Sequence, residues 1–468
     1  MPKTPFFSVA IPEPLNRQLA QHLLRDDGDE DLCFAIYYPS TGATRTTAIL
    51  HAAILPNKGD RKVHGNASFE APYFERALQL AKAAGGGLAF LHSHPYDGWQ
   101  DMSRDDHNAE AGHAGAAAAV TGHPLVGLTL GTDGAWSART WQRIKPKTYT
   151  PTWARSVRVV GKALRVTWHP RLEPKYLIGD EINRTVSFWG DANQRDLGRL
   201  RVGIVGLGSV GSILAESLAR TGVRHLTLID FDVIKNHNLD RTAGARPQDA
   251  KRKTPKVLVA QRNLNQAATA QGFAVAPLET SIVKPDGYRA ALDCDVLFSC
   301  VDRPWPRRVL NHIAYSHLIP VIDGGISVRH APDARFKNAN WSIRTSGPER
   351  VCLECTGAYD PGLVSTEQQG YLDDPSYLAS LPHDSPLRRR ENVHAVSMAV
   401  ASFEIMQLVA LVTGLVHMHD VGEQRYSYYP GIVETRAPAC EANCPHQAVT
   451  GLGDEGDRRT GNILENNP

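Results

Sequence analysis

The sequence lacks an excess of charge of either sign. Among its 468 residues, 51 Lys and Arg stand against 49 Asp and Glu, which gives a formal net charge of +2. A protein that binds nucleic acid through its phosphates needs a strongly basic surface, so this balance argues against that class. The hydrophobic share of 42% and the charged share of 21% are typical of globular domains. The length predicts about two to four of them.

A signal peptide and a long uninterrupted apolar run are also missing. The first residues do not show a charged segment followed by an apolar one. The most apolar stretch, His394 to Val416, contains Glu404 and Gln407. It is therefore predicted to be a buried core helix and not a membrane span. We expect a cytoplasmic protein that does not associate with membranes.

Cysteine is scarce, and its spacing is informative. Seven cysteines in a chain of this length do not indicate a disulfide framework. Cys352 and Cys355 form a CxxC pair, and Cys440 and Cys444 form a CxxxC pair. Together they could supply four thiolates to one tetrahedral structural zinc ion. A redox role for the CxxC pair is the alternative. The three upstream cysteines lie in predicted strands, and Cys294 and Cys300 are expected to be buried as small apolar side chains.

The stretch from Val202 to Arg241 predicts the fold of the second half. A short apolar strand leads into a GxGxxG turn, an apolar-periodic helix follows, and a second apolar strand ends at Asp230. This order is typical of a Rossmann-like α/β domain. The first two glycines let the backbone approach a phosphate, the third lets the helix pack on the sheet, and the acid binds a ribose. Taken alone, the pattern indicates a dinucleotide-dependent dehydrogenase.

The residues after the acid change that interpretation. Asp230-Phe-Asp-Val, followed by Asn238-Leu-Asp-Arg241, resembles the ubiquitin-activating superfamily, which includes the MoeB and ThiF adenylating enzymes. The resemblance runs over roughly residues 181–445. It implies an adenylyltransferase that uses ATP and Mg²⁺, and it implies a homodimer. By this resemblance the nucleotide-binding residues are Gly206, Gly208, Gly211, Asp230 on the ribose, Asn238, Arg241 and Lys256 on the phosphates, and Asp302 on magnesium.

Arg184 lies in a segment that matches the first helix of these enzymes, where an arginine reaches the phosphates, often across the dimer interface. A solvated surface arginine is the alternative. The cations suit the chemistry, because ATP and a carboxylate repel one another and charge builds on the α-phosphate oxygens.

The first 150 residues contain a different pattern. An apolar strand ends in His92-Ser-His94-Pro95, and alternate positions on a strand point to one face, so both histidines can bind one ion. Ser103 and Asp106 follow in the sequence SRDD. Together the two motifs resemble the JAMM (JAB/MPN-type) metalloproteases. A satisfied histidine pair and a helix cap are the alternative.

This second resemblance implies a zinc site and its chemistry. His92, His94 and Asp106 would be zinc ligands, with a bound water whose pKa the metal lowers. Glu30, at the head of an apolar strand, is the best match for the general base, and Asp31 is the second choice. Ser103 would donate a hydrogen bond to the developing oxyanion.

We therefore predict an α/β protein with four parts. A JAMM-like zinc isopeptidase domain occupies residues 1–150, and a linker occupies residues 151–180. A ThiF/MoeB-like adenylation domain with a four-cysteine zinc knot occupies residues 181–448, and a disordered tail follows at residues 449–468. The expected cofactors are one catalytic and one structural Zn²⁺, ATP and Mg²⁺.

The two resemblances predict one substrate class, a ubiquitin-like protein that ends in glycine. The first domain would trim or deconjugate it, and the second would adenylate its carboxylate. The activated protein would then pass to a conjugating enzyme. Alternatively, a sulfur-carrier protein would become a thiocarboxylate. The segment from Thr356 to Arg390 stands where thioester-forming relatives carry a cysteine, but it contains none. Either no thioester forms, or Ser365, Thr366 or a zinc-site cysteine accepts the acyl group.

Overall fold

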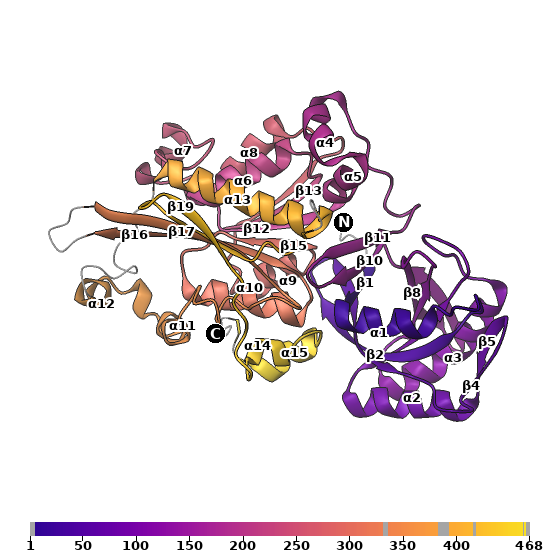
Figure 1. Cartoon of the computed structure of the whole chain (residues 1–468). Coiled ribbons are helices and arrows are strands. Elements are labelled where there is room, and N and C mark those ends of the chain that lie inside the picture. The colour runs from indigo at the N-terminus through magenta and orange to yellow at the C-terminus, as the bar shows by residue number, and fades with distance from the viewer. Residues whose placement is uncertain (1–4, 331–335, 382–392, 415–417, 462, 465–468) are drawn as a thin grey trace. The chain divides into compact units, whose positions relative to one another are not determined.

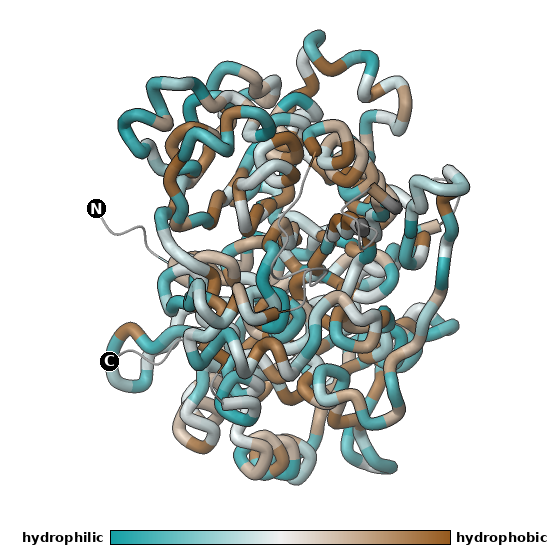
Figure 2. Tube along the Cα trace, turned by 90° about the vertical axis from the view of Figure 1, so that its left-hand side faces the viewer, coloured by the Kyte–Doolittle hydropathy of each residue, from teal (hydrophilic) through white to brown (hydrophobic). Residues whose placement is uncertain are grey.

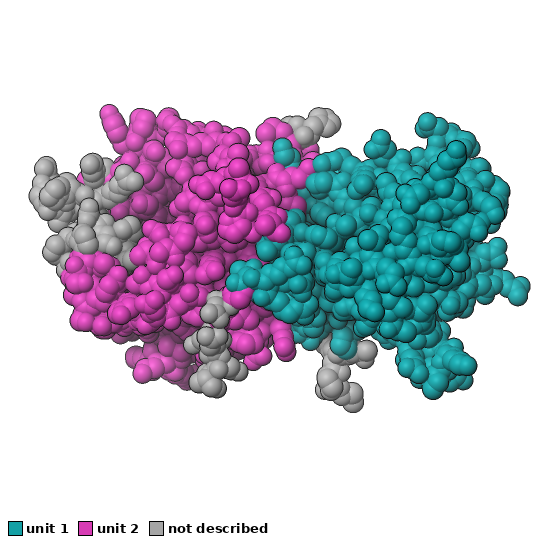
Figure 3. Space-filling model, turned by 90° about the horizontal axis from the view of Figure 1, so that it is seen from below, with its two compact units in different colours: residues 1–175, 316–318, 449–460 teal, residues 176–315, 319–448, 461–468 magenta. Residues whose placement is uncertain are grey.

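The computed structural model describes residues 5–330, 336–381, 393–414, 418–461 and 463–464. The chain divides into two compact units (Figure 3). The first contains residues 1–175, 316–318 and 449–460, and the second contains residues 176–315, 319–448 and 461–468. Many of the peripheral loops are hydrophilic (Figure 2).

The first unit is built on a nine-stranded mixed sheet in the order β11-β10-β1-β3-β2-β6-β7-β8-β9. Its strands are β1 (Phe6–Pro12), β2 (Leu32–Thr41), β3 (Arg45–Ile54), β6 (Gly87–Ser93), β7 (Val126–Leu130), β8 (Trp136–Lys145), β9 (Thr148–Trp153), β10 (Ser156–Val160) and β11 (Leu164–Trp168). A separate hairpin pairs β4 (Arg61–His64) with β5 (Asn66–Phe69).

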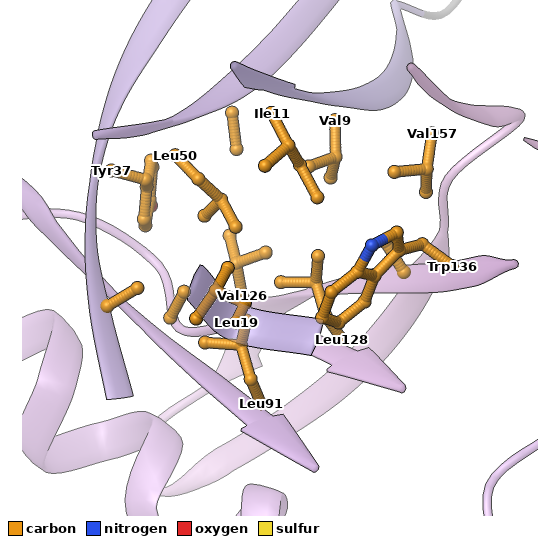
Figure 4. Close-up of a cluster of buried hydrophobic side chains, with 14 of the residues drawn as sticks. Val9, Ile11, Leu19, Tyr37, Leu50, Leu91, Val126, Leu128, Trp136 and Val157 are labelled. Atoms are coloured by element: carbon orange, nitrogen blue, oxygen red, sulfur yellow. The ribbon is translucent and has the colours of Figure 1, made fainter. Parts of the chain in front are cut away.

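Helices cover both faces of this sheet (Figure 1). The helix α1 (Glu13–Leu23) buries Leu15, Leu19 and Leu23, which recur every four residues and so form one face. They join a core with the inward side chains of β1, β3 and β7 (Figure 4). On the other face, α2 (Ala71–Ala84) and α3 (Arg104–Thr121) pack over Phe34 and Phe90.

The second unit contains an eight-stranded sheet in the order β14-β13-β12-β15-β16-β17-β18-β19. The first five strands of this order are parallel and the rest are antiparallel. Its strands are β12 (Arg201–Val205), β13 (His225–Ile229), β14 (Ala274–Leu278), β15 (Val296–Ser299), β16 (Val321–His330), β17 (Phe336–Ser346), β18 (Glu423–Ser427) and β19 (Ile432–Arg436).

Helices lie on both faces of the second sheet as well (Figure 1). The helices α6, α8 and α13 cover one face, and α9 and α10 cover the other. The helices of this unit are α4 (Asn183–Trp189), α5 (Asp191–Arg199), α6 (Ser209–Arg220), α7 (Pro247–Arg252), α8 (Lys256–Ala267), α9 (Pro285–Leu292), α10 (Pro304–Ser316), α11 (Pro361–Gln368), α12 (Pro375–Ser380), α13 (His394–Thr413) and α14 (Pro445–Ala448).

The order of the parallel strands positions a ligand site. The strand β12 lies between β13 and β15. After β12 the chain adds β13 and β14 on one side of it, and then returns to add β15 and β16 on the other side. In open α/β sheets such a switch point opens a crevice at the carboxyl ends of the strands. The glycine turn follows β12, Asp230 follows β13, and Asp302 follows β15, which places all three at this edge.

One helix in the described part of the chain, α13, is long and apolar enough to cross a membrane. Within the second unit it packs against α6, β16 and β17. It buries Glu404 and Gln407, and the Gln407 side-chain oxygen accepts a hydrogen bond from Thr345 Oγ1 at 2.8 Å. A buried polar side chain that is hydrogen-bonded within the unit, as Gln407 is, is typical of a core helix.

The structure corrects the predicted linker at residues 151–180. The first unit continues to Lys175, and β9, β10 and β11 belong to its sheet. The apolar residues of β10 are buried, and Val157 pairs with Val9 of β1 in parallel. The segment becomes ordered because its valines bury apolar surface against a strand about 150 residues earlier, a pairing that local composition does not reveal.

The predicted disordered tail is also corrected. Residues 449–460 belong to the first unit, and α15 (Asp454–Thr460) forms there. The Asp454 carboxylate accepts hydrogen bonds from Thr41 N at 2.9 Å and from Thr41 Oγ1 at 2.6 Å, and Leu452 is buried. Two side chains therefore order a segment whose composition is otherwise polar.

The strand β15 is short, because α9 extends to Leu292 and the Asp295 carboxylate accepts a hydrogen bond from Arg201 N at 2.9 Å. The cysteine-free segment from Thr356 to Arg390 contains α11 and α12, and its residues 382–390 lie outside the described chain.

A substitution at Gly453 tests the docking of the tail. A Cβ at Gly453 would lie 2.3 Å from Pro39 O, whereas a Cβ at Gly461 would meet nothing within 4 Å. The φ angles are similar, +52° and +57°, so backbone strain is matched between the two. We expect Gly453→Ala to lower the free energy of unfolding by about 1–3 kcal/mol more than Gly461→Ala, because it overpacks the contact. Urea denaturation followed by circular dichroism measures the difference, and equal midpoints would show that the tail is not docked.

Candidate functional site

Three metal-ligating side chains converge in the first unit. His92 lies on β6, His94 follows that strand, and Asp106 lies in the first turn of α3. The two Nε2 atoms are 3.2 Å apart, and the Asp106 oxygens lie 3.3 Å from His92 Nε2 and 3.2 Å from His94 Nε2. A tetrahedral zinc ion with bonds of about 2.0–2.1 Å requires ligand separations of about 3.3–3.4 Å. The triangle of donor atoms therefore fits a zinc ion with one position left open.

The start of α3 fixes the carboxylate. Ser103 is the N-cap and accepts a hydrogen bond from Asp106 N at 3.1 Å, while Asp106 Oδ2 accepts one from Ser103 N at 2.8 Å. This reciprocal pair is a capping box. The helix-cap alternative and the ligand hypothesis are therefore compatible, because one carboxylate caps the helix and faces both histidines. Ser103 is exposed, and accepting the cap bond leaves its hydroxyl proton free to donate.

The ionisation of the cluster suits a cation. Burial alone would raise the pKa of Asp106, but hydrogen bonds from His92, His94 and the Ser103 backbone outweigh it and hold that pKa well below its usual range. Burial lowers the pKa of His92, which favours the neutral imidazole that ligates metals. A carboxylate and a neutral histidine are the forms a zinc ion binds.

The structure distinguishes the two candidates for the general base. Burial raises the pKa of Glu30, and His94 and Asp106 are close enough to influence it. Asp31 is buried and accepts hydrogen bonds from Arg61 Nη2 at 2.6 Å and from Leu32 N at 2.8 Å. Burial alone would raise the pKa of Asp31, but Arg61 and the Leu32 backbone outweigh it and lower that pKa. Because Asp31 is already bonded to Arg61 and to the Leu32 backbone, Glu30 is the better candidate for the general base.

Two of the three glycines in the glycine turn of the second unit have no room for a side chain. Gly206 has φ +91°, and a Cβ there would lie 2.4 Å from Cys300 O. A Cβ at Gly211 would lie 1.9 Å from Gly206 O. Gly208 is the N-cap of α6, and a Cβ there would meet nothing within 4 Å. The first turn of α6 therefore presents backbone N–H groups next to open space, the arrangement that binds a phosphate.

Asp230 holds this turn from the neighbouring strand. One of its carboxylate oxygens accepts a hydrogen bond from Leu207 N at 2.6 Å, and the other accepts one from Asp232 N at 2.7 Å. Burial raises the pKa of Asp230, and Lys256 partly opposes this. Lys256, at the start of α8, donates to Asp232 at 2.7 Å and lies 3.9 Å from Asp230 Oδ2. The predicted ribose acid and phosphate cation are thus neighbours.

The remaining predicted nucleotide residues lie in less enclosed places. Asn238 accepts a hydrogen bond from Lys235 N at 2.9 Å and closes a short 3₁₀ turn, Asn236–Asn238. Arg241 is half-buried and pairs with the adjacent Asp240 at 2.9 Å. Asp302 is exposed in the loop after β15, and Arg184 is exposed on α4. The roles of these four residues remain predictions.

Sequence reasoning missed a buried polar group beside the switch point. Asp323 on β16 accepts hydrogen bonds from Ser299 Oγ at 2.7 Å and from Arg307 Nε at 3.0 Å. Glu404 of α13 is buried nearby, and its carboxyl oxygens have no hydrogen-bond partner in the described chain. Burial and the neighbouring Asp323 raise the pKa of Glu404 well above its usual value. The sequence signal that could have revealed this group is Asp323, an acid directly after the apolar pair Val321 and Ile322.

The four cysteines predicted to form a zinc knot do converge. The sulfur atoms of Cys352, Cys355, Cys440 and Cys444 all lie within 4.8 Å of one another. Cys352 Sγ and Cys444 Sγ are 3.6 Å apart, close to the separation of about 3.8 Å that Zn–S bonds of about 2.3 Å require. Backbone N–H groups of Cys352 and Cys355 donate to sulfur atoms at 3.2 and 3.3 Å, which stabilises thiolates. The site could hold zinc, and the convergence of four sulfurs disfavours the redox alternative.

The sequence pattern of the ThiF family matches residues 182–441, more than half of the chain. This chain belongs to the ThiF family. The match covers the glycine turn, Asp230 and the first three cysteines of the knot. It leaves the His92–His94–Asp106 cluster outside.

Curated relatives are similar over parts of their length. The tRNA threonylcarbamoyladenosine dehydratase 2 of Saccharomyces cerevisiae is 30% identical over 159 residues, which cover 33% of this chain and 35% of that protein. The SAMP-activating enzyme E1 of Haloferax volcanii is 28% identical over 193 residues, covering 41% and 63%. The molybdopterin-synthase adenylyltransferase of Escherichia coli is 33% identical over 126 residues, covering 26% and 48%. The chain thus spans between about a third and two thirds of each of these relatives.

Among solved structures, MccB of E. coli with ATP is similar over 57% of this chain and 74% of that chain. The TM-score is 0.43, and 16% of the residues are identical.

The four-cysteine cluster and the His92–His94–Asp106 cluster predict two zinc ions that are lost to a chelator at different rates. The four-thiolate site should resist chelation, whereas the three-ligand site has an open position and should lose its metal first. We expect Asp106→Ala to bind one zinc ion per chain and wild type to bind two, measured by plasma emission spectrometry. Asp105→Ala, one residue earlier and exposed, is the control and should bind two. An unchanged zinc content in Asp106→Ala would remove Asp106 from the ligand set.

Proposed function

We propose that the second unit is an ATP-dependent adenylyltransferase that activates the C-terminal carboxylate of a glycine-ended sulfur-carrier or ubiquitin-like protein. The observation that carries this proposal is the placement of the glycine turn, Asp230 and Asp302 at one sheet edge of a ThiF-family unit. The α6 N-terminus would receive phosphate oxygens, Asp230 fixes the turn and would bind the ribose, and Asp302 would hold magnesium. Magnesium supplies positive charge to the phosphates when bound.

The cations of this chain serve the displacement at the α-phosphate. A carboxylate approaching ATP is repelled, and negative charge builds on the α-phosphate oxygens as pyrophosphate leaves. Lys256 and Arg241 supply positive charge there. Lys256 must exchange its 2.7 Å bond to Asp232 for a phosphate oxygen. Arg184 would reach the nucleotide of a second copy in a homodimer formed through this unit.

Of the two fates for the acyl-adenylate, thiocarboxylate formation is favoured. Residues 356–390 contain no cysteine, and Ser365 and Thr366 lie on α11. Cys33 and Cys294 are buried, and burial raises the pKa of Cys300 well above its usual value. A thiolate ready to form a thioester is therefore lacking outside the four-cysteine cluster. The relatives include the sulfur carrier protein ThiS adenylyltransferase of Bacillus subtilis, 27% identical over 135 residues.

Conjugation is the second candidate. It rests on the similarity to the SAMP-activating enzyme E1 and to the ubiquitin-like modifier-activating enzyme 5 of Drosophila willistoni, which is 28% identical over 147 residues. In that case a conjugating enzyme would receive the activated protein.

For the first unit we propose a zinc-dependent peptidase that cuts after the glycine of the same substrate class. The support is the donor triangle of His92, His94 and Asp106 together with the placement of Glu30 beside it. Zinc would supply a water of lowered pKa and polarise the scissile carbonyl. Glu30 would take a proton from the attacking water and give it to the leaving amine nitrogen as the C–N bond breaks. The Ser103 hydroxyl would donate to the carbonyl oxygen as negative charge develops.

ATP–pyrophosphate exchange tests the adenylation proposal. With a ThiS-type protein ending in glycine, Asp302→Ala and Arg241→Ala should each slow exchange by about a hundredfold or more, because each removes charge stabilisation in the transition state. Arg220→Ala, at the exposed end of α6, is the matched control for Arg241 and should leave exchange unchanged. His92→Ala should also leave exchange intact. Dinucleotide reduction without any exchange would overturn the proposal.

Cleavage of an extended substrate tests the peptidase proposal. Glu30→Gln should retain two zinc ions but lose cleavage of a ThiS-type protein extended beyond its glycine, because a base is removed and no ligand is. Glu75→Gln, exposed on α2, is the control. Cleavage by Glu30→Gln at the wild-type rate would exclude Glu30 as the base.

A further inference from the structure

Arg241, proposed to bind the phosphates, lies in a loop outside the sheet. We call residues 238–246 the Arg241 loop. After the 3₁₀ turn that ends at Asn238, the loop contains neither helix nor strand until α7 begins at Pro247. Asn238 O accepts hydrogen bonds from Arg241 N at 3.2 Å and from Thr242 N at 2.9 Å, which makes a tight turn. The position of Arg241 relative to the N-terminus of α6 therefore depends on the contacts that this loop makes with neighbouring helices.

Ser212 of α6 makes the first of these contacts. It is buried, and its Oγ accepts a hydrogen bond from Ala243 N at 3.0 Å and donates one to Ser209 O at 3.3 Å. Its backbone N–H donates to Gly208 O at 3.1 Å. The single hydroxyl proton and an acceptor lone pair are thus both used. One residue joins the glycine turn, the first residue of α6 and the Arg241 loop.

Arg262 of α8 holds the other end of the loop. Its Nη2 donates to Gly244 O at 2.8 Å. The same guanidinium donates to both carboxylate oxygens of Asp249 at 2.8 Å, and Asp249 Oδ2 also accepts from Arg246 N at 2.9 Å. The helix that carries Arg262 begins at Lys256, the second proposed phosphate cation. The loop is therefore fixed to the two helices whose first turns face the proposed nucleotide.

Close packing restricts the loop further at Gly244. Its φ is +75°, and a Cβ there would lie 2.9 Å from Asn263 Cγ, so the backbone rests directly on α8. Asn263 Nδ2 donates to Glu216 Oε2 of α6 at 2.7 Å, and α6 packs along α8. The two helices and the loop are thus joined pairwise, which leaves the loop little freedom to move alone.

We propose that Ser212 is a positioning residue for adenylation, which holds Arg241 at the distance from the α6 N-terminus that one triphosphate requires. The inference rests on the adenylation proposed for the second unit. The helix N-terminus and Arg241 must meet oxygens of the same nucleotide, and a misplacement of about 1 Å can cost about a hundredfold in rate. Ser212 is suited to this role because its hydroxyl bonds both to the first residue of α6 and to Ala243, two residues after Arg241.

ATP–pyrophosphate exchange by the full-length protein, with a ThiS-type protein ending in glycine, tests the proposal. Ser212→Ala should lower kcat about tenfold and change the KM for ATP much less, because the misplaced charge matters most in the transition state. In the Arg241→Ala background the same substitution should slow exchange by less than about twofold, because the side chain that Ser212 positions is gone. A hydroxyl with a purely structural role would cause the same loss in both backgrounds.

Ser217→Ala is the matched control. It removes another serine hydroxyl of α6, which is bonded to Ile213 O at 2.9 Å within the helix, and it should leave exchange unchanged. Thermal unfolding followed by circular dichroism should place both variants within a few degrees of each other. An equal loss in the two backgrounds, or exchange by Ser212→Ala at the wild-type rate, would overturn the positioning role.

A second variant decides the question if Ser212→Ala does not fold. Arg262→Lys keeps a positive charge beside Asp249, but an ammonium cannot bond both to that carboxylate in a bidentate manner and to Gly244 O. It should also slow exchange, and again by less than about twofold in the Arg241→Ala background. Equal losses in the two backgrounds would contradict positioning by the loop contacts. A wild-type protein that shows no exchange at all would instead overturn the adenylation proposal itself.

Discussion

An aspartate carboxylate that accepts hydrogen bonds from backbone N–H groups fixes the geometry of the glycine turn and of the His92–His94–Asp106 cluster. Asp230 accepts from Leu207 N and Asp232 N, so it ties the glycine turn to the end of the neighbouring strand. Asp106 accepts from Ser103 N and caps the helix that carries it. In both cases the oxygens that shape the backbone also face the proposed ligand. A change at either acid would therefore disturb local structure and chemistry together.

Charge is balanced locally at both sites, although by different means. In the second unit, Lys256 lies between Asp230 and Asp232, and the proposed phosphate would compete with Asp232 for it. In the first unit, the positive charge of Arg139 is already committed to Glu110, so it adds little net charge beside a metal. A site that binds an anion needs an exchangeable cation, whereas a site that binds a cation needs neutral or negative ligands held firmly. Lys256 with its two aspartates suits the first requirement, and Arg139 paired with Glu110 suits the second.

Much of this arrangement could be predicted from short motifs, since a motif carries its own geometry. The GxGxxG turn, the acid after the next strand, and the HxH pair each require only local strand and helix periodicity. The sequence ranked Glu30 above Asp31 as the general base, but it could not show that Asp31 is held by Arg61, which reaches it from the β4–β5 hairpin. The strand β10 and the docked tail were missed for the same reason, since their partners lie far away in sequence.

If both proposed activities are present, their chemistry fixes their order. Peptide cleavage after glycine leaves a free carboxylate, and that carboxylate is the nucleophile that adenylation needs. A substrate with its extension intact has an amide at this position, which cannot attack ATP. Once the carboxylate is converted to an adenylate or a thiocarboxylate, no peptide bond remains for the first unit to cut. Cleavage must therefore come before adenylation, even if the two sites act independently. A peptidase on the same chain raises the local concentration of trimmed substrate without any coupling between the metals.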